Sequence, residues 1–176
     1  MYSNHTVSPD IPDCLLLCFR DIHASSIIRP MQPLVALGAA AWDWPEWSDA
    51  FYPSDLPEEW RLTYYNTQFS CVFLAEPAWR QAGAAAYEAW ATATHGQFVF
   101  LLEGARAEEV PRELVGRAHG VTQSDSDLLW FDRATSLKTL AGQLASACGT
   151  QLYLLSRDGA LGQIERVRTL LLVMGR

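Results

Sequence analysis

Leu34-Val35-Ala36-Leu37 is a run of four apolar residues, and runs of the same kind recur along the chain. Such a run is typical of a strand that is covered on both faces, as in a parallel sheet. The starts of successive runs lie 37, 27, 30 and 24 residues apart, close to the ~30 residues of a strand, a crossover helix and the next parallel strand. The further runs are Cys71 to Leu74, Phe98 to Leu102, Leu128 to Phe131 and Leu152 to Leu155.

The segments between the runs carry apolar residues at helical spacing. A stripe from Trp79 to Ala93 predicts one helix, Leu137 to Ala145 a second and Leu161 to Leu171 a third. Asp55 to Glu59 resembles a helix start, with a proline and carboxylates in the first turn. The alternation predicts an α/β fold with a parallel sheet of about five strands, either truncated and TIM-barrel-like or open.

The chain has 176 residues, which suffice for one domain with a substantial core. We expect residues 31–176 to form a single α/β domain, in which 104–127 is the least regular stretch and holds a short helix around 112–117. Residues 1–30 show neither a strand period nor a helix period and are predicted to be an irregular N-terminal arm. Met31 stands directly before the first predicted strand and is a candidate for the natural start, in which case the arm is not native.

The composition argues against several classes of function. Thirteen Lys and Arg against twenty Asp and Glu leave a net charge of -7, which opposes binding a nucleic acid over a broad surface. The longest apolar runs, Leu15 to Leu17 and Leu170 to Met174, are far shorter than the ~20 residues of a membrane-spanning helix. The first thirteen residues carry no Lys or Arg, unlike a secretory signal. We therefore expect a soluble, cytoplasmic protein that binds neither nucleic acid nor membrane.

The cysteines and histidines predict no metal site. Cys14 and Cys18 do not form a Cys-x-x-Cys pair, and Cys71 and Cys148 lie far from them in the sequence. The four histidines include no pair at positions i and i+4, which would place two imidazoles on one helical face. The chain contains no phosphate loop, dinucleotide fingerprint or nucleophile elbow, so no cofactor is predicted.

Aromatic motifs follow the first predicted strand in a characteristic order. They are the turn Gly38-Ala39-Ala40-Ala41-Trp42, then Trp44, Trp47, the triplet Phe51-Tyr52-Pro53, Trp60 and Tyr64-Tyr65. This order resembles the YecE-like family of uncharacterised proteins, over roughly residues 34–106. The resemblance implies a TIM-barrel-like fold with its site at the carboxyl ends of the strands, and it implies no established reaction.

The chain departs from this family at positions that the resemblance assigns to the site. The family's turn reads Gly-Thr-Ser-Gly-Trp, whereas Ala39-Ala40-Ala41 carries no hydroxyl. The family's second strand ends in a Glu-Ile-Asn-Ser-like run, where this chain has Phe73-Leu74-Ala75-Glu76, and Glu103 stands where the third strand usually carries Lys. The resemblance therefore implies a degenerate active site. A complete eight-stranded barrel also takes about 250 residues, more than this chain has.

Charged and aromatic residues follow the predicted strands, at the edge where α/β proteins bind ligands. Glu76, Glu103 and Asp132 are candidate catalytic residues, because paired carboxylates can act as general acid and base. The candidate ligand-binding residues are Trp42, Trp44, Arg106, Arg133, Arg157 and Asp158, because arginines bind anions and aromatic faces bind sugars. The same residues also fit a structural role as salt bridges, helix caps, turn residues and core aromatics.

Three functions remain open on these grounds. The one that we expect is a non-catalytic YecE-like protein in binding or assembly, because polar residues of the family's site are replaced. The alternative is a hydrolase for a phosphorylated or sugar substrate, with Arg106 or Arg157 holding an anion. The third is a structural partner that completes its sheet against another chain. The expected partners are accordingly a small anionic or sugar ligand, or a second copy that covers an exposed sheet edge.

Overall fold

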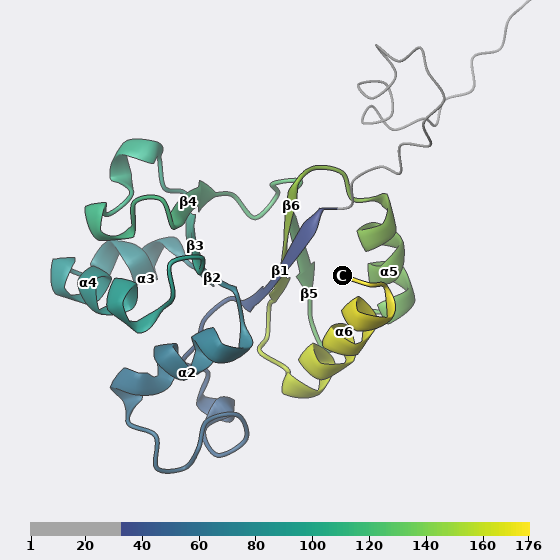
Figure 1. The fold of residues 1–176 in the computed structure, drawn as a ribbon, viewed down its shortest axis with the longest axis horizontal. Coiled ribbons are helices and arrows are strands. Elements are labelled where there is room, and N and C mark those ends of the chain that lie inside the picture. The colour runs from purple at the N-terminus through teal and green to yellow at the C-terminus, as the bar shows by residue number, and fades with distance from the viewer. Residues whose placement is uncertain (1–32) are drawn as a thin grey trace, which may run out of the picture. The chain divides into compact units, whose positions relative to one another are not determined.

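Six parallel strands form one sheet in the computed structural model, which describes residues 33–176 (Figure 1). They are β1 (Leu34–Ala39), β2 (Cys71–Leu74), β3 (Val99–Glu103), β4 (Ala118–Val121), β5 (Leu128–Phe131) and β6 (Gln151–Ser156). The predicted α/β class with a parallel sheet is therefore confirmed. The arm predicted for residues 1–30 lies outside the described residues.

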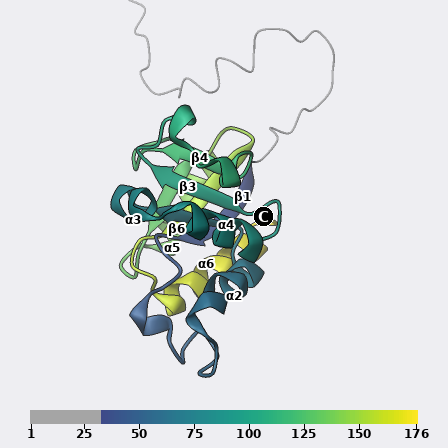
Figure 2. The same ribbon diagram turned by 90° about the vertical axis from the view of Figure 1, so that its left-hand side faces the viewer.

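Helices accompany the sheet on its outer face. Figure 1 shows α5 and α6 beside β5 and β6, and the turned view of Figure 2 shows α3 and α4 in front of the strands. No helix of residues 33–176 is long and apolar enough to cross a membrane. The α-helices are α2 (Arg61–Gln68), α3 (Glu76–Gln81), α4 (Ala84–Ala93), α5 (Leu137–Ser146) and α6 (Leu161–Val173), and the short 3₁₀ helices are η1 (Pro45–Trp47), η2 (Glu58–Trp60), η3 (Ala107–Glu109) and η4 (Arg112–Leu114).

The strand order, β4-β3-β2-β1-β6-β5, is that of a barrel with one opening. The strands from β1 to β4 are added side by side, the chain then passes to β5 at the opposite edge, and β6 returns between β5 and β1. First and last strands are neighbours, as in a closed eight-stranded barrel, which would need two strands more. Residues 122–127 connect the two strands that border the opening.

The sheet curls until side chains from distant strands meet on its concave face. The rings of Phe73 on β2 and Trp130 on β5 have centroids only 4.9 Å apart, although β1 and β6 lie between these strands. In a flat sheet, three strand spacings would separate them by roughly 14 Å. The buried residues of the concave core all belong to strands and are Ala36, Cys71, Phe73, Leu101, Val121, Leu128, Tyr153 and Leu155.

The outer face of the sheet packs against the helices through stacked aromatic rings. Trp47, Tyr65 and Phe69 are buried, and the Tyr65 and Phe69 centroids lie 4.4 Å apart. The Tyr65 hydroxyl accepts a hydrogen bond from the Ala39 N–H at 2.9 Å and donates one to the Cys71 carbonyl at 2.8 Å. Tyr65 therefore ties β1 to β2, which pair at only two residue positions.

Two details differ from the sequence expectation. The stripe from Trp79 to Ala93 forms two helices, α3 and α4, because Ala82 and Gly83 are extended and glycine disfavours a helix interior. The sheet has six strands instead of about five, because β4 is absent from the prediction. Its sequence, Ala118 to Val121, places two exposed residues between two buried ones, which is neither an apolar run nor an alternation. The helix expected around 112–117 is the short η4.

Gly38 on β1 leaves room for the backbone of β2, and this contact can be tested. An added Cβ would lie 2.3 Å from the Cys71 carbonyl oxygen. We therefore expect Gly38→Ala to lower the free energy of unfolding, measured in urea, by about 1–3 kcal/mol. Gly142→Ala is the matched control, because its Cβ would meet nothing within 4 Å and it lies inside α5. This control should raise stability by about 0.5–1 kcal/mol; equal effects would contradict the close approach.

Candidate functional site

The carboxyl ends of the strands gather at one end of the curled sheet, which we call the mouth. Every residue that the sequence analysis selected follows a strand at this end. Trp42 and Trp44 follow β1, Glu76 follows β2, Glu103 ends β3 and Arg106 comes after it, Asp132 and Arg133 follow β5, and Arg157 and Asp158 follow β6.

A chain of hydrogen bonds crosses the mouth. Gln123 Nε2 donates to Glu103 Oε1 at 2.7 Å, and Arg157 Nη1 donates to Gln123 Oε1 at 3.4 Å. The Trp130 indole N–H donates to the Gln123 carbonyl at 3.2 Å. We call Glu103, Gln123 and Arg157 the mouth bridge. It joins the ends of β3 and β6 through the segment that connects β4 to β5.

Apolar side chains lie directly beneath the mouth bridge. The Arg157 guanidinium lies 4.6 Å from the centroid of the Trp130 ring, and that ring contacts Phe73. Tyr153 and Leu155 of β6 are buried in the same concave core. Phe73 stands where the YecE-like pattern has Glu, so an aromatic ring occupies the interior at that position. The chain's own side chains fill this part of the interior.

Glu76 joins the mouth bridge at its β3 end. Its backbone N–H donates to Glu103 Oε2 at 3.2 Å, so the structure brings these two candidates together. The Glu76 carboxylate accepts a hydrogen bond from Arg80 Nε at 2.8 Å, and Arg80 also binds Glu109 at 3.1 Å. Hydrogen bonds to Glu109 and Glu76 raise the pKa of Arg80, and the Arg80 side chain lowers the pKa of Glu109. Arg80 thus holds two carboxylates in ion pairs.

Three of the candidates after β5 and β6, Asp132, Arg133 and Asp158, lie apart from the mouth bridge. Asp132 accepts hydrogen bonds from the Ala134 N–H at 2.9 Å and the Thr135 hydroxyl at 2.8 Å, which close its own turn. Arg133 pairs with Asp158 at 2.8 Å. Burial raises the pKa of Asp158, but hydrogen bonds from the side chain and backbone of Arg133 outweigh it, so the pKa is lowered. Asp132 is not joined to the other candidate carboxylates.

Trp42 and Trp44 are partly buried against different elements. The ring of Trp42 meets Trp90 of α4 edge to face, with centroids 5.4 Å apart. Trp44 lies over Gly159, where an added Cβ would be 2.8 Å from the indole. Gly159 has a φ of 62°, in the left-handed region that glycine adopts readily. The two aromatic candidates therefore make packing contacts.

Arg106 is exposed, and its backbone N–H donates to Glu109 at 2.8 Å. Cys71 is completely buried, and burial raises the pKa of its thiol, which disfavours the nucleophilic thiolate. Among residues 33–176, no group of three or more His, Cys, Asp or Glu is arranged to hold a metal ion.

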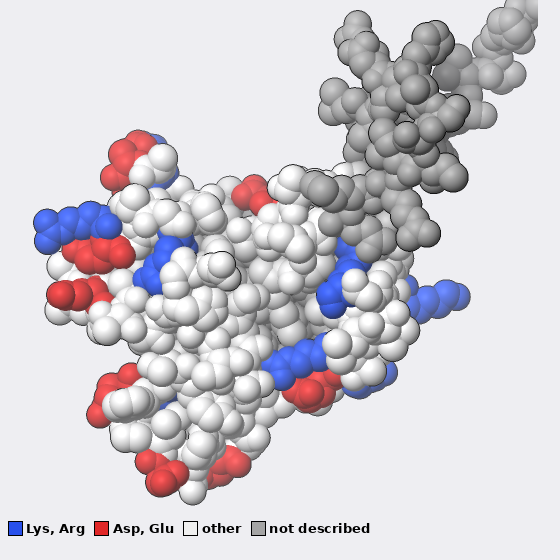
Figure 3. Space-filling view, in the orientation of Figure 1, with Lys and Arg blue, Asp and Glu red and all other residues white. Residues whose placement is uncertain are grey.

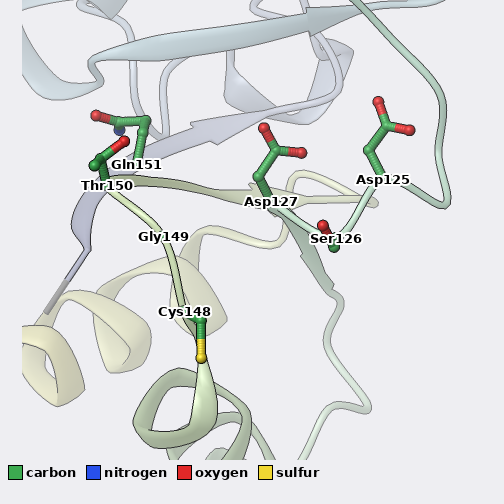
Figure 4. Close-up of a pocket in the computed structure, with 7 residues that line it drawn as sticks. All are labelled: Asp125, Ser126, Asp127, Cys148, Gly149, Thr150 and Gln151. Atoms are coloured by element: carbon green, nitrogen blue, oxygen red, sulfur yellow. The ribbon is translucent and has the colours of Figure 1, made fainter. Parts of the chain in front are cut away.

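A hollow of about 470 Å³ lies at the opposite, amino ends of β5 and β6 (Figure 4). Figure 4 shows the carboxylates of Asp125 and Asp127 pointing away from Cys148. The Asp125 carboxylate accepts hydrogen bonds from the side chain and backbone of Thr122, and these lower its pKa. None of the residues selected from the sequence lines this hollow, which is lined by residues 125–127 and 148–151.

Sequence reasoning missed Gln123, Trp130 and Arg80. Gln123 follows β4, the strand that was not predicted, so nothing marked it as a residue of the mouth. Trp130 lies inside an apolar run, where an aromatic residue suggests only a buried strand. The spacing of Glu76 and Arg80, one helical turn apart, was the available signal for the ion pair.

A protein-family model described as "Protein of unknown function DUF72" matches residues 36–152. The chain belongs to this family. The YecE-like membership expected from the sequence is thus confirmed, and the DUF72 match runs well past residue 106, into β6. No curated protein and no solved structure matches the chain. Because the function of DUF72 proteins is unknown, membership assigns no reaction.

The Arg133–Asp158 pair predicts a pH dependence of stability. A carboxyl group whose pKa is lowered by folding stabilises the protein above its unfolded-state pKa, and this is lost as the pH falls through the folded-state pKa. Wild type should therefore be more stable than Asp158→Asn at about pH 7, and urea denaturation should show the difference closing in acid. Arg133→Gln should reproduce the loss at neutral pH. A difference that persists unchanged in acid would show that the ion pair is not its cause.

Proposed function

We propose that this member of the DUF72 family is non-catalytic and acts in binding and assembly. The observation that carries the proposal is the filled interior, where the rings of Phe73 and Trp130 lie 4.9 Å apart beneath the mouth bridge. A substrate would have to displace both rings to enter. Reaching a transition state there would also cost the packing energy of two large aromatic side chains.

The polar groups of the mouth support the same proposal. The Glu76 carboxylate is held by Arg80 in an ion pair at 2.8 Å. Glu103 uses one carboxylate oxygen to accept from Gln123 and the other to accept from the Glu76 N–H. These contacts suit a closed surface better than a reaction centre.

The open edge of the sheet supports the role in assembly. The Arg117 carbonyl accepts a hydrogen bond from the Phe100 N–H at 2.8 Å and therefore faces β3. Successive residues of a strand direct their backbone groups to opposite sides, which turns those of Ala118 and Gly120 toward the open edge. Within residues 33–176, β4 pairs with β3 on one side and with no strand on its open side. Unpaired edge groups of this kind are a template for another strand.

A groove of about 370 Å³ accompanies this edge, which we call the β4 edge groove. No α-helix stands between β4 and β5 in the chain, and Val115 is 69% exposed in the groove. Natural proteins often protect the edge strands of a sheet with charged side chains. Here the lining contains no Asp, Glu, Lys or Arg; it consists of Ala105, Ala107, Val110, Val115, Gly116, Ala118, His119 and Gly120.

The partner at the β4 edge groove is a second copy of this chain. Because the lining carries no Asp, Glu, Lys or Arg, two identical grooves meet without repulsion between such groups. An antiparallel pair of β4 strands about a two-fold axis uses the same patch on both copies, as in most homodimers. The chain as a whole is acidic, with a net charge of -7, whereas the groove lining contains no Asp, Glu, Lys or Arg. This distribution fits a cytoplasmic protein that stays soluble outside this contact.

Self-association at this edge predicts the behaviour of Val115→Asp. A carboxylate buried without a partner opposes association, so we expect the dimer dissociation constant, measured by sedimentation equilibrium, to rise at least about tenfold, or 1.4 kcal/mol. Val173→Asp is the control, because Val173 is 81% exposed at the end of α6, away from the groove. A wild type that stays monomeric at all concentrations, or equal effects of both variants, would contradict the proposal.

The non-catalytic role predicts that no ligand binds at the mouth in a thermal-shift screen. We expect sugars, sugar phosphates and nucleotides to leave the wild-type Tm unchanged, because the interior is occupied. A rise of a few degrees, abolished by both Glu103→Gln and Arg157→Ala, would instead reveal a ligand site. That outcome would favour the hydrolase for a phosphorylated or sugar substrate.

A further inference from the structure

A second groove, of about 680 Å³, lies between α2 and α4, apart from the mouth and from the β4 edge. We call it the α2–α4 groove. One wall comes from the start of α2 and the turn before it, and the other comes from one face of α4. Its lining residues are Glu59, Trp60, Thr63, Ala85, Glu88, Ala89, Thr92 and Ala93.

Trp60 gives this groove a large apolar surface. It is 58% exposed, whereas Trp47 and Trp79 are buried in the core. An indole has a wide apolar face and a polar N–H, and tryptophan is among the residues that contribute most at protein interfaces. The exposed ring therefore offers an anchor for a partner.

The α4 wall of the groove is made of small side chains. Ala85 and Ala89 lie four residues apart, so they share one face of the helix, and both are exposed. Helix α4 packs against the core through Tyr87, Trp90 and Ala91, and Ala85 and Ala89 take no part in that contact. Small side chains let another helix approach closely and lie along the groove, as helices do in other hydrophobic grooves.

The charges of the groove select the chemistry of the partner. The lining contains two charged residues, Glu59 and Glu88, and both are acidic. Arg112 interacts electrostatically with Glu88, but its guanidinium is hydrogen-bonded to Glu113 at 2.8 Å. On the face shown in Figure 3, by contrast, Lys and Arg lie scattered among Asp and Glu. A second copy, with its net charge of -7, would bring further negative charge, so the groove suits a basic partner.

We propose that the α2–α4 groove binds a basic amphipathic helix of a partner protein. The apolar face of that helix packs on Trp60 and Ala89, and its Lys or Arg side chains pair with Glu59 and Glu88. A cation near the exposed Trp60 ring gains a further cation–π attraction. This interaction does not depend on the β4 edge, so it adds a partner to the assembly proposed above.

The test uses a fluorescein-labelled helical peptide of Leu and Lys, roughly 18 residues long, with Leu at helical spacing. Fluorescence anisotropy with the full chain should give a dissociation constant in the micromolar range, roughly 1–100 µM. We expect Glu88→Lys and Trp60→Ser each to weaken binding at least about fivefold, because one reverses a charge pair and the other removes the anchor. A peptide with Glu in place of Lys should not bind.

Glu108→Lys is the matched control, because Glu108 is exposed outside the groove and its replacement changes the net charge as Glu88→Lys does. It should leave the dissociation constant within about twofold of wild type. Equal weakening by Glu108→Lys would mean that only the overall charge attracts the peptide, and would overturn the proposal. So would unaltered binding to both groove variants, or a wild-type dissociation constant above about 1 mM. All three variants should keep the wild-type Tm, since Trp60, Glu88 and Glu108 are exposed.

Discussion

The contact between Phe73 and Trp130 is the constraint on which the rest of this fold depends. A parallel sheet must cover two faces, and here the helices cover only the outer one. Six strands are too few to close a standard eight-stranded barrel, so the inner face is shielded because the sheet curls onto its own large side chains. Smaller residues at these two positions would leave a void that six strands cannot close.

The same contact decides what the mouth can be. The Trp130 ring contacts both the Arg157 guanidinium and the Phe73 ring, so the polar layer rests on an aromatic floor. Gln123 lies above this floor because the connection from β4 to β5 is short and crosses the opening of the sheet. In a complete barrel, further strands and helices would take the place of that connection. The six-stranded sheet therefore determines the mouth and the open edge together.

Most of the fold can be predicted from the sequence, because a covered parallel strand is an apolar run that depends only on neighbouring residues. The strand from Ala118 to Val121 escapes this reasoning, since an edge strand with two exposed residues has no such run. The positions of the selected charges could be predicted from the common direction of the strands. The partners could not, because Trp42 meets Trp90, and Arg157 meets Gln123, only after distant segments have folded together.

The central place of β1 has a consequence for how this chain reaches its fold. All six residues of β1 pair with β6, whereas only two pair with β2, so the longest ladder of β1 is made with residues synthesised more than a hundred positions later. Contacts of such sequence separation slow folding. During synthesis, one edge of β1 is therefore unpaired until β6 leaves the ribosome, and the nascent chain must be kept from pairing with other chains until then.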